Sequence, residues 1–266
     1  MNSSLKYDGK KFEKGSVIEV TDPLTVEQAL EIDINEKPFT VVMQTPGDEI
    51  DLTRGLLYAE DVIRKNTPVE YTVTKNKFDQ ITHVNATIQE KNLSKGYLSS
   101  RSLLSVSSCV ICGKQSLEDF PKNSGTLKAD FSPLSSEFLF QLQEKMVKNQ
   151  TLFSLTGGCH GVAAFDLKGN LLSLKEDIGR HNALDKVVGE LIGMNTISSA
   201  QLITFSGRIS YEIVSKCFRA KIPIIIAVSS PSSLAIDFAK EYGMTILGFS
   251  RKNKTTCYSN PWRIKS

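Results

Sequence analysis

The chain has 266 residues, of which 40% are hydrophobic and 23% are charged, and its formal net charge is +3 at neutral pH. A chain of this length can bury a large core without structural metals or disulfides. So small a net charge excludes a general electrostatic attraction to DNA or RNA, and we expect no nucleic-acid partner.

Neither the start of the chain nor its apolar runs indicate export or membrane insertion. The first residues, MNSSLKYDGKKFEKG, contain no apolar stretch of the kind found in secretory signals. The most apolar run, residues 222–228, is far shorter than the roughly 20 residues that a membrane-spanning helix requires. Five cysteines, an odd number, favour a reducing compartment in which thiols stay free. We therefore expect a cytoplasmic protein that does not contact a membrane.

The first hundred residues contain mainly β-type segments after a polar start. We predict that residues 1–14 are frayed and that strands cover residues 17–20, 29–34, 39–44, 69–73 and 83–89. The sequence Pro46-Gly47-Asp48 predicts a turn that also caps a helix through residues 52–58. Together these segments predict a β-rich N-terminal lobe over residues 15–105.

Residues 91–130 show weak periodicity and contain many Ser, Lys and Gly. Two cysteines, Cys109 and Cys112, lie in this stretch. Because loops carry chemistry more often than core elements do, we predict a mobile Cys-x-x-Cys loop over residues 106–120.

The last part of the chain, residues 125–260, alternates between strand and helix patterns. Ser132 and Pro133 predict the start of a helix with Phe138, Leu142 and Met146 on one face. Strands are predicted at residues 152–155, 162–165, 171–174, 202–205, 223–228 and 244–249, the last being the final strand, and helices at 181–192, 209–218 and 232–242. Such alternation predicts parallel strands in an α/β lobe with helices packed on the sheet faces.

The cysteine pair is the chemically richest feature of the sequence. Two cysteines three residues apart can approach one another in a turn, so that one can attack a sulfur atom held by the other. Arg101 and Lys114 lie near enough in sequence to favour the nucleophilic thiolate. Such a pair is also typical of half a zinc site, but Cys159, Cys217 and Cys257 form no second close pair. We favour sulfur or redox chemistry without a bound metal, and keep zinc and incidental cysteines as alternatives.

A glycine cluster follows the predicted strand at 152–155. Gly157, Gly158 and His160 lie in the sequence Thr-Gly-Gly-Cys-His-Gly, where glycines let backbone N–H groups approach an anion. The alternative is a tight connection between strands. The sequence lacks the Gly-Lys-Ser/Thr ending of a phosphate-binding Walker loop.

Basic residues recur after other predicted strands. Arg180 and His181 open a helix whose N-terminus suits an anion, although Asp177 could instead cap that helix while Arg180 pairs with Glu176. Ser206, Gly207 and Arg208 follow the strand at 202–205. At and just beyond the end of the last predicted strand lie Phe249, Ser250, Arg251, Lys252, Asn253 and Lys254. In open α/β sheets ligands bind beyond the carboxyl ends of the strands, so a ligand with several phosphates would explain the recurrence.

Taken together, these stretches resemble the formate dehydrogenase accessory sulfurtransferase family. The residues Glu-Asp-Ile-Gly-Arg-His-Asn-Ala-Leu-Asp-Lys at 176–186 are similar to its most specific signature, and residues 108–114 are similar to its cysteine loop. Residues 156–160, 206–212, 245–251 and 45–48 match in the same order. The resemblance spans roughly residues 20–260.

The resemblance implies a sulfurtransferase that receives sulfur from a cysteine desulfurase as a persulfide on Cys109, with Cys112 as its partner. The acceptor would be the molybdenum cofactor, bis-molybdopterin guanine dinucleotide, bound transiently on its way to formate dehydrogenase. Residues 249–254 correspond to the family's cofactor segment. The family also implies a three-layer fold related to cytidine deaminases, with a mixed sheet, and a homodimer.

Deaminase activity does not follow from that fold, because the chain has no His-x-Glu sequence and its cysteine pair precedes His160. Smaller departures from the family pattern are Ala29, residues 59–61 and Cys159, which stands where an apolar residue is more usual. The main alternative function is a non-catalytic chaperone that binds the molybdenum cofactor and docks on the dehydrogenase without carrying sulfur.

Overall fold

The computed structural model describes residues 3–94, 96–97, 125–128 and 131–265. They form a mixed α+β structure in which a six-stranded sheet and a four-stranded sheet are accompanied by two two-stranded ribbons. This confirms the expected fold class. No helix in the described part of the chain combines the length and the apolar character needed to cross a bilayer.

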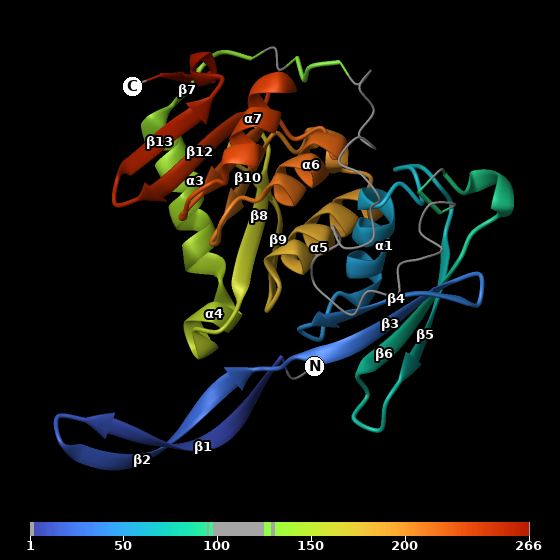
Figure 1. Cartoon of the computed structure of the whole chain (residues 1–266), viewed down its shortest axis with the longest axis vertical. Helices are drawn as coiled ribbons and strands as arrows, with labels where there is room; N and C mark the ends of the chain where they lie inside the picture. The colour runs from blue at the N-terminus through green and yellow to red at the C-terminus, as the bar shows by residue number, and fades with distance from the viewer. Residues whose placement is uncertain (1–2, 95, 98–124, 129–130, 266) are drawn as a thin grey trace.

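The chain begins with a long antiparallel hairpin that projects from the rest of the molecule (Figure 1). Strands β1 (Ser4–Glu13) and β2 (Ser16–Thr25) pair along their whole length. Lys14 and Gly15 connect them with φ angles of 47° and 83°, as expected for a two-residue turn whose twist matches the strands. The prediction that residues 1–14 are frayed was wrong for residues 4–13, because cross-strand pairing orders a segment that is polar by composition; residues 1 and 2 lie outside the described part of the chain.

The N-terminal sheet has the strand order β4-β3-β6-β5. Its strands are β3 (Gln28–Ile34), β4 (Lys37–Gln44), β5 (Glu70–Lys75) and β6 (Ile81–Thr87), and helix α1 (Glu49–Ala59) packs on it, with the short 3-10 helix η1 (Glu90–Asn92) following. Alternate residues of β3, namely Leu30, Ile32 and Ile34, are fully buried in a core shared with α1. The four predicted strands and the helix are present with boundaries shifted by a few residues.

The main sheet has the order β13-β12-β11-β10-β8-β9. Its strands are β8 (His160–Phe165), β9 (Leu171–Asp177), β10 (Leu202–Phe205), β11 (Ile224–Ala227), β12 (Thr245–Arg251) and β13 (Lys254–Ser259). The central strands β10, β11 and β12 are parallel, whereas β8, β9 and β13 run antiparallel to their neighbours. The predicted parallel arrangement is therefore limited to the centre of the sheet.

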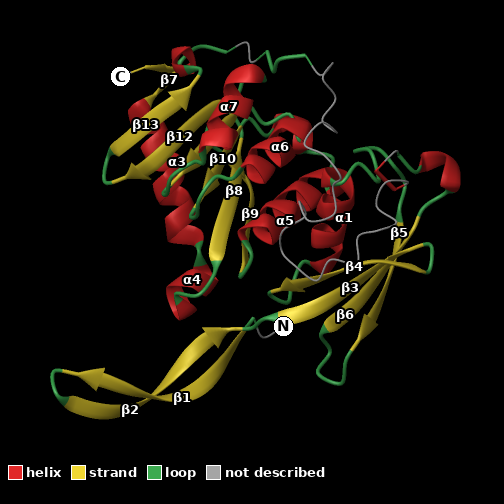
Figure 2. Ribbon diagram, in the orientation of Figure 1, coloured by secondary structure: helices red, strands yellow, loops and turns green. Residues whose placement is uncertain are grey.

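Helices cover both faces of this sheet and make three layers (Figure 2). Helix α3 (Ser136–Asn149) lies on one face, and α5 (Arg180–Gly193), α6 (Tyr211–Arg219) and α7 (Ser233–Glu241) lie on the other. Because side chains alternate along a strand, Ile224 and Ile226 pack toward α3 while Ile225 packs toward the opposite helices. Strands buried on both faces explain the continuous apolar run at 222–228.

Three local predictions in this half need correction. Residues 152–155 belong to a helix, α4 (Thr151–Thr156), because the Glu176 carboxylate accepts hydrogen bonds from the first N–H groups of that turn. Helix α3 begins after Ser135, whose hydroxyl accepts from Phe138 N, so Ser132 is not its cap. The strand predicted at 244–249, β12, is not the final strand, because β13 and β14 follow it.

Four short elements complete the described structure. They are the 3-10 helices η4 (Ile197–Ser199) and η5 (Pro261–Arg263) and the paired strands β7 (Leu134–Ser135) and β14 (Ile264–Lys265).

Helices α1 and α5 pack closely and join the N-terminal sheet to the main one. A Cβ atom on Gly55 would lie 1.9 Å from the carbonyl oxygen of Asp185, and one on Gly189 would lie 1.8 Å from that of Asp51. Only glycine at both positions allows this approach. The contact fixes the position of α5, whose first residues reach the site described next.

Candidate functional site

The loops that carry the predicted site residues meet at one edge of the main sheet. The parallel strands β10, β11 and β12 end there, and the antiparallel strand β8 begins there with His160. His160 is paired with Asp177, the last residue of β9, so the chain enters α5 at the same edge. The sheet topology therefore brings together segments that lie far apart in sequence.

His160, Arg180 and Gly207 form the first cluster at this edge. A Cβ atom on Gly207 would lie 3.1 Å from His160 Nδ1 and 3.7 Å from Arg180 Cδ, so both side chains lie over this glycine. Ser206 fixes the loop, because its hydroxyl accepts a hydrogen bond of 2.9 Å from Gly161 N. Burial and then the charge of Arg180 hold the pKa of His160 below its ordinary value, with Arg208 adding to the effect. The cluster thus carries a neutral imidazole beside two guanidinium groups.

Arg180 is not paired with Glu176. Glu176 accepts hydrogen bonds from α4 and from the Cys159 thiol at 3.4 Å, and Arg180 forms no ion pair among the described residues. Asp177 accepts from Gly179 N, at the start of α5, and does not pair with Arg180. The alternative in which Arg180 pairs with Glu176 was therefore wrong, and no carboxylate in the described part of the chain forms an ion pair with its guanidinium.

His181 is buried at the first turn of α5. Its Nδ1 atom lies 3.3 Å from a Glu212 carboxylate oxygen. Burial, followed by the nearby charges of Lys216 and Arg180, lowers the pKa of His181 to about 3. The imidazole is therefore neutral at neutral pH, and its contact with Glu212 is not a salt bridge. His181 therefore packs beneath the cluster and does not supply a positive charge that could hold an anion.

The loop that presents Arg180 is held by a buried ion pair. Asp177 Oδ2 lies 2.8 Å from Lys186 Nζ, and both side chains are almost completely buried. Lys186 also donates to Thr45 O at 2.7 Å, and Asp177 Oδ1 accepts from Asn182 Nδ2. These contacts connect the N-terminal lobe to the start of α5.

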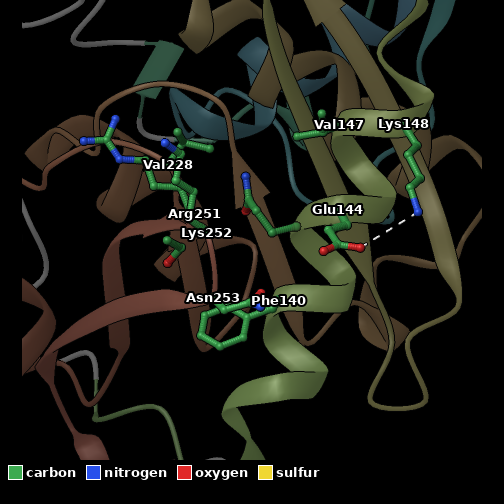
Figure 3. A pocket seen from close by; sticks show the side chains of 10 residues that line it. Phe140, Glu144, Val147, Lys148, Val228, Arg251, Lys252 and Asn253 are labelled. Carbon is green, nitrogen blue, oxygen red and sulfur yellow. Dashed lines mark ion pairs between the residues drawn. The ribbon is translucent and has the colours of Figure 1, made fainter.

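A second cluster lies on the α3 face of the same edge. A cavity of about 300 Å³ is bounded by α3 and by the loops that end β11 and β12; its lining residues are Phe140, Gln143, Glu144, Val147, Lys148, Val228, Ser250, Arg251, Lys252 and Asn253. Figure 3 shows Arg251 and Lys252 across this cavity from Glu144 and Lys148, whose charged groups are 3.8 Å apart. Neither Arg251 nor Lys252 forms an ion pair within the described part of the chain.

Gln143 is a buried polar residue of this cavity. Its side chain is 6% exposed, and neither its Nε2 nor its Oε1 atom has a hydrogen-bond partner among the described residues. A buried amide without a partner costs about 1–3 kcal/mol. Because the side chain has three rotatable bonds and lies beside a cavity, a ligand with donor and acceptor atoms could satisfy it.

Only part of the predicted cofactor segment, residues 249–254, lines the cavity. Ser250, Arg251, Lys252 and Asn253 line the cavity, whereas Phe249 and Lys254 are not among its lining residues. Lys252 and Asn253 both have positive φ and form the two-residue turn between β12 and β13. Gly157, with φ 66°, ends α4, and Gly158 lies beside Thr25, so helix termination accounts for the first of these glycines.

The sequence did not indicate the α3 wall of this cavity. Phe140, Gln143 and Val147 follow the helical spacing, but they lie beside the buried stripe of Leu142 and Met146. A second stripe on a helix, apolar except for Gln143, has no ligand signature of its own, so only the packing of α3 against the strand ends identifies it.

The cysteines of the chain differ in their environment. Cys109 and Cys112 lie outside the described residues, and so does the predicted loop 106–120. Burial and the adjacent Glu176 carboxylate raise the pKa of Cys159 to about 12, which keeps it a thiol and makes it a poor sulfur acceptor. Among the described residues no three His, Cys, Asp or Glu side chains are placed so that they could share a metal ion.

Comparisons with known proteins agree with each other over almost the whole chain. Residues 25–265 match the model of the FdhD/NarQ family. The chain is 40% identical over 244 residues to the sulfur carrier protein FdhD of Sulfolobus acidocaldarius, covering 91% of each chain, and 35% identical over 264 residues to that of Streptomyces coelicolor, covering 94% of this chain and 92% of the relative. A crystal structure of a putative formate dehydrogenase accessory protein from Desulfotalea psychrophila has the same fold, with a TM-score of 0.75 at 21% identity over 98% of this chain and 99% of that one.

Proposed function

This chain belongs to the FdhD/NarQ family, and from that membership we propose that it carries sulfur for a formate dehydrogenase. The observation that carries the proposal is its 35–40% identity, over most of its length, to relatives named sulfur carrier protein FdhD. The chain contains the Cys109-Val110-Ile111-Cys112 sequence that such chemistry needs.

The first chemical step is a thiolate exchange. The Cys109 thiolate attacks the terminal sulfur of a persulfide on a cysteine desulfurase, a new S–S bond forms on Cys109, and the desulfurase cysteine leaves as a thiolate. In the release step the Cys112 thiolate attacks Cys109 Sγ, which forms the disulfide and expels the carried atom as hydrosulfide. The two thiolates supply the electrons of that reduction.

We further propose that the acceptor is the molybdenum cofactor, bis-molybdopterin guanine dinucleotide, bound as a substrate at the strand-end edge. This proposal is supported by two clusters of basic residues that lie at the same edge of the main sheet. Arg180 and Arg208 suit one group of phosphates, and Arg251 and Lys252 suit another. The cavity between α3 and the turn at 252–253 offers a heterocyclic ring apolar walls and the amide of Gln143, to which no described residue hydrogen-bonds.

Mass spectrometry tests the sulfur step directly. The purified chain is incubated with a cysteine desulfurase and cysteine, and peptides are examined for one added sulfur atom. We expect the addition on the Cys109 peptide of the wild type and its loss in Cys109→Ala. Cys257→Ala, which removes a half-buried thiol whose pKa is raised by burial, is the matched control and should retain the addition.

The rival function is that of a cofactor chaperone without a sulfur step. It predicts that Cys109→Ala still supports full activation of a formate dehydrogenase. A wild-type chain that gains no sulfur from the desulfurase, together with an active Cys109→Ala variant, would replace our proposal by this one.

A further inference from the structure

Two of the three described cysteines, Cys159 and Cys257, lie on opposite sides of the main sheet. Cys159 immediately precedes β8 and Cys257 lies in β13, and three other strands of the sheet separate β8 from β13. Four spacings of about 4.8 Å place these two strands roughly 19 Å apart. Because a disulfide requires Cα atoms within about 7 Å of each other, Cys159 and Cys257 cannot form one.

The third described cysteine, Cys217, is distant from both. Its carbonyl accepts a hydrogen bond from Ile222 N, just before the start of β11, whereas Cys159 lies at the edge where β11 ends. The four-residue strand β11, about 13 Å long, therefore separates the two cysteines. Cys217 also belongs to the core on the α5–α7 face of the sheet, while Cys257 packs against the core on the α3 face. The three described cysteines thus cannot act in pairs.

Each of these three thiols is also poorly suited to react alone. Cys217 is fully buried, and burial raises the pKa of its thiol. The buried Cys159 thiol donates to the Glu176 carboxylate. Cys257 Sγ donates to Ser259 O at 3.3 Å, and burial raises the pKa of this thiol too. Since the thiolate is the form that attacks a disulfide, all three remain unreactive thiols at neutral pH.

Under the proposed function, each hydrosulfide that leaves the chain leaves a Cys109–Cys112 disulfide behind. The chain has five cysteines, and the other three are those just described. The two electrons that reopen the disulfide must therefore come from outside the chain. We propose, resting on that function, that a protein dithiol of the thioredoxin type reduces the Cys109–Cys112 disulfide once for every sulfur atom delivered.

The exchange balances without any further reagent. One thiolate of the reductant attacks a sulfur atom of the Cys109–Cys112 bond, which forms a mixed disulfide and releases one cysteine as a thiolate. The second thiolate of the reductant then attacks the reductant's own sulfur in the mixed disulfide and releases the other cysteine. Two electrons and two protons pass to the chain, and the reductant leaves as a disulfide.

A dithiol is favoured over a monothiol such as glutathione because the first exchange is reversible. After a monothiol opens the bond, the freed cysteine is only three positions from the mixed disulfide in the sequence and can attack it again. A group on so short a tether has an effective concentration in the millimolar range, so the bond recloses before a second monothiol arrives. A dithiol has the same advantage, because its own second thiol is tethered beside the mixed disulfide.

Two successive loadings of the purified, reduced chain test the proposal. Sulfur is supplied by a desulfurase that already carries a persulfide and has been freed of cysteine, so that no small thiol is present. After hydrosulfide release, alkylation and mass spectrometry should find three free thiols and a Cys109–Cys112 peptide that has lost two hydrogens. A second loading should then fail. Reduced thioredoxin should restore it to the first level, and glutathione at equal thiol concentration should act at least ~10-fold more slowly.

Two variants complete the experiment. Cys159→Ala combined with Cys257→Ala removes two described thiols and should lose and regain loading as the wild type does. Cys112→Ala should accept one sulfur atom, retain it and form no disulfide.

Two outcomes would refute the external reduction: a wild type that releases hydrosulfide with all five thiols still alkylatable, or one that accepts a second sulfur without a reductant. Equal rates with glutathione and thioredoxin would refute the assignment to a dithiol. A first loading that fails would overturn the sulfur-carrier function itself, and this proposal with it.

Discussion

At the scale of a single residue, Gln143 could serve either as a packing residue of the core or as a ligand-binding residue of the cavity. Its amide is buried and no described residue hydrogen-bonds to it, which is unfavourable for the folded chain by itself. It also lines the cavity beside Arg251 and Lys252, where a ligand would satisfy it. Removing the amide should therefore not destabilise the free protein, but it should weaken binding of a ligand in the cavity.

We predict that Gln143→Leu leaves the free protein as stable as the wild type or more stable by about 1 kcal/mol, because it removes an unsatisfied buried amide. The same change should weaken binding of guanosine diphosphate, used as a fragment of the proposed cofactor, by roughly ten-fold. Chemical denaturation and calorimetric titration measure the two effects. Gln141→Leu changes an exposed glutamine on the same helix and should alter neither. Unchanged nucleotide affinity in Gln143→Leu would show that the amide is only a packing residue.

At the scale of elements, the contact between α1 and α5 depends on two glycines. Each allows a backbone carbonyl of the other helix to lie where a Cβ atom would be. The N-terminal residues of α5, including Arg180, are therefore positioned by packing about two turns further along the same helix.

We predict that Gly189→Ala destabilises the protein by at least about 2 kcal/mol, because the helices must separate, and alanine's better helix propensity of about 1 kcal/mol offsets only part of this. Urea denaturation measures the change. Gly125→Ala is the control, since no atom lies within 4 Å of its added Cβ, and it should change stability by less than ~0.5 kcal/mol. Equal stability of both variants would mean that the α1–α5 contact adapts.

At the scale of the whole molecule, the N-terminal lobe and the main sheet are connected through buried charges. Lys186 contacts both Asp177 and the Thr45 carbonyl, and Thr45 N donates to Asp177 Oδ2. Removing one member of such a pair leaves the other charge buried and uncompensated.

Lys186→Met should therefore lower the free energy of unfolding by about 3–5 kcal/mol, and adding Asp177→Asn should recover part of the loss. Lys75→Met, which breaks the exposed Lys75–Asp79 pair, serves as the control and should cost less than ~0.5 kcal/mol. Thermal or urea unfolding of the four proteins provides the comparison. A loss in Lys186→Met no larger than in Lys75→Met would contradict the proposed connection between the lobes.

The sequence by itself determined the features that depend on local patterns. The strands at 29–34, 162–165, 171–174 and 202–205 and the helices at 52–58 and 181–192 follow from periodicity and turn residues, and all are present. The basic loops after the strands were also visible, because strand ends in an α/β sheet meet at one edge. The family resemblance, which the comparisons confirm, rests on the order of these short stretches.

Only the tertiary structure decided features that depend on contacts between distant segments. Residues 152–155 form a helix because Glu176 binds their N–H groups, and residues 4–13 form a strand because β2 pairs with them. The α3 wall of the cavity and the position of Arg180, which forms no ion pair with any described residue, likewise follow from long-range packing. Local propensity is worth a fraction of a kcal/mol per residue, so a buried charge or a paired strand can override it.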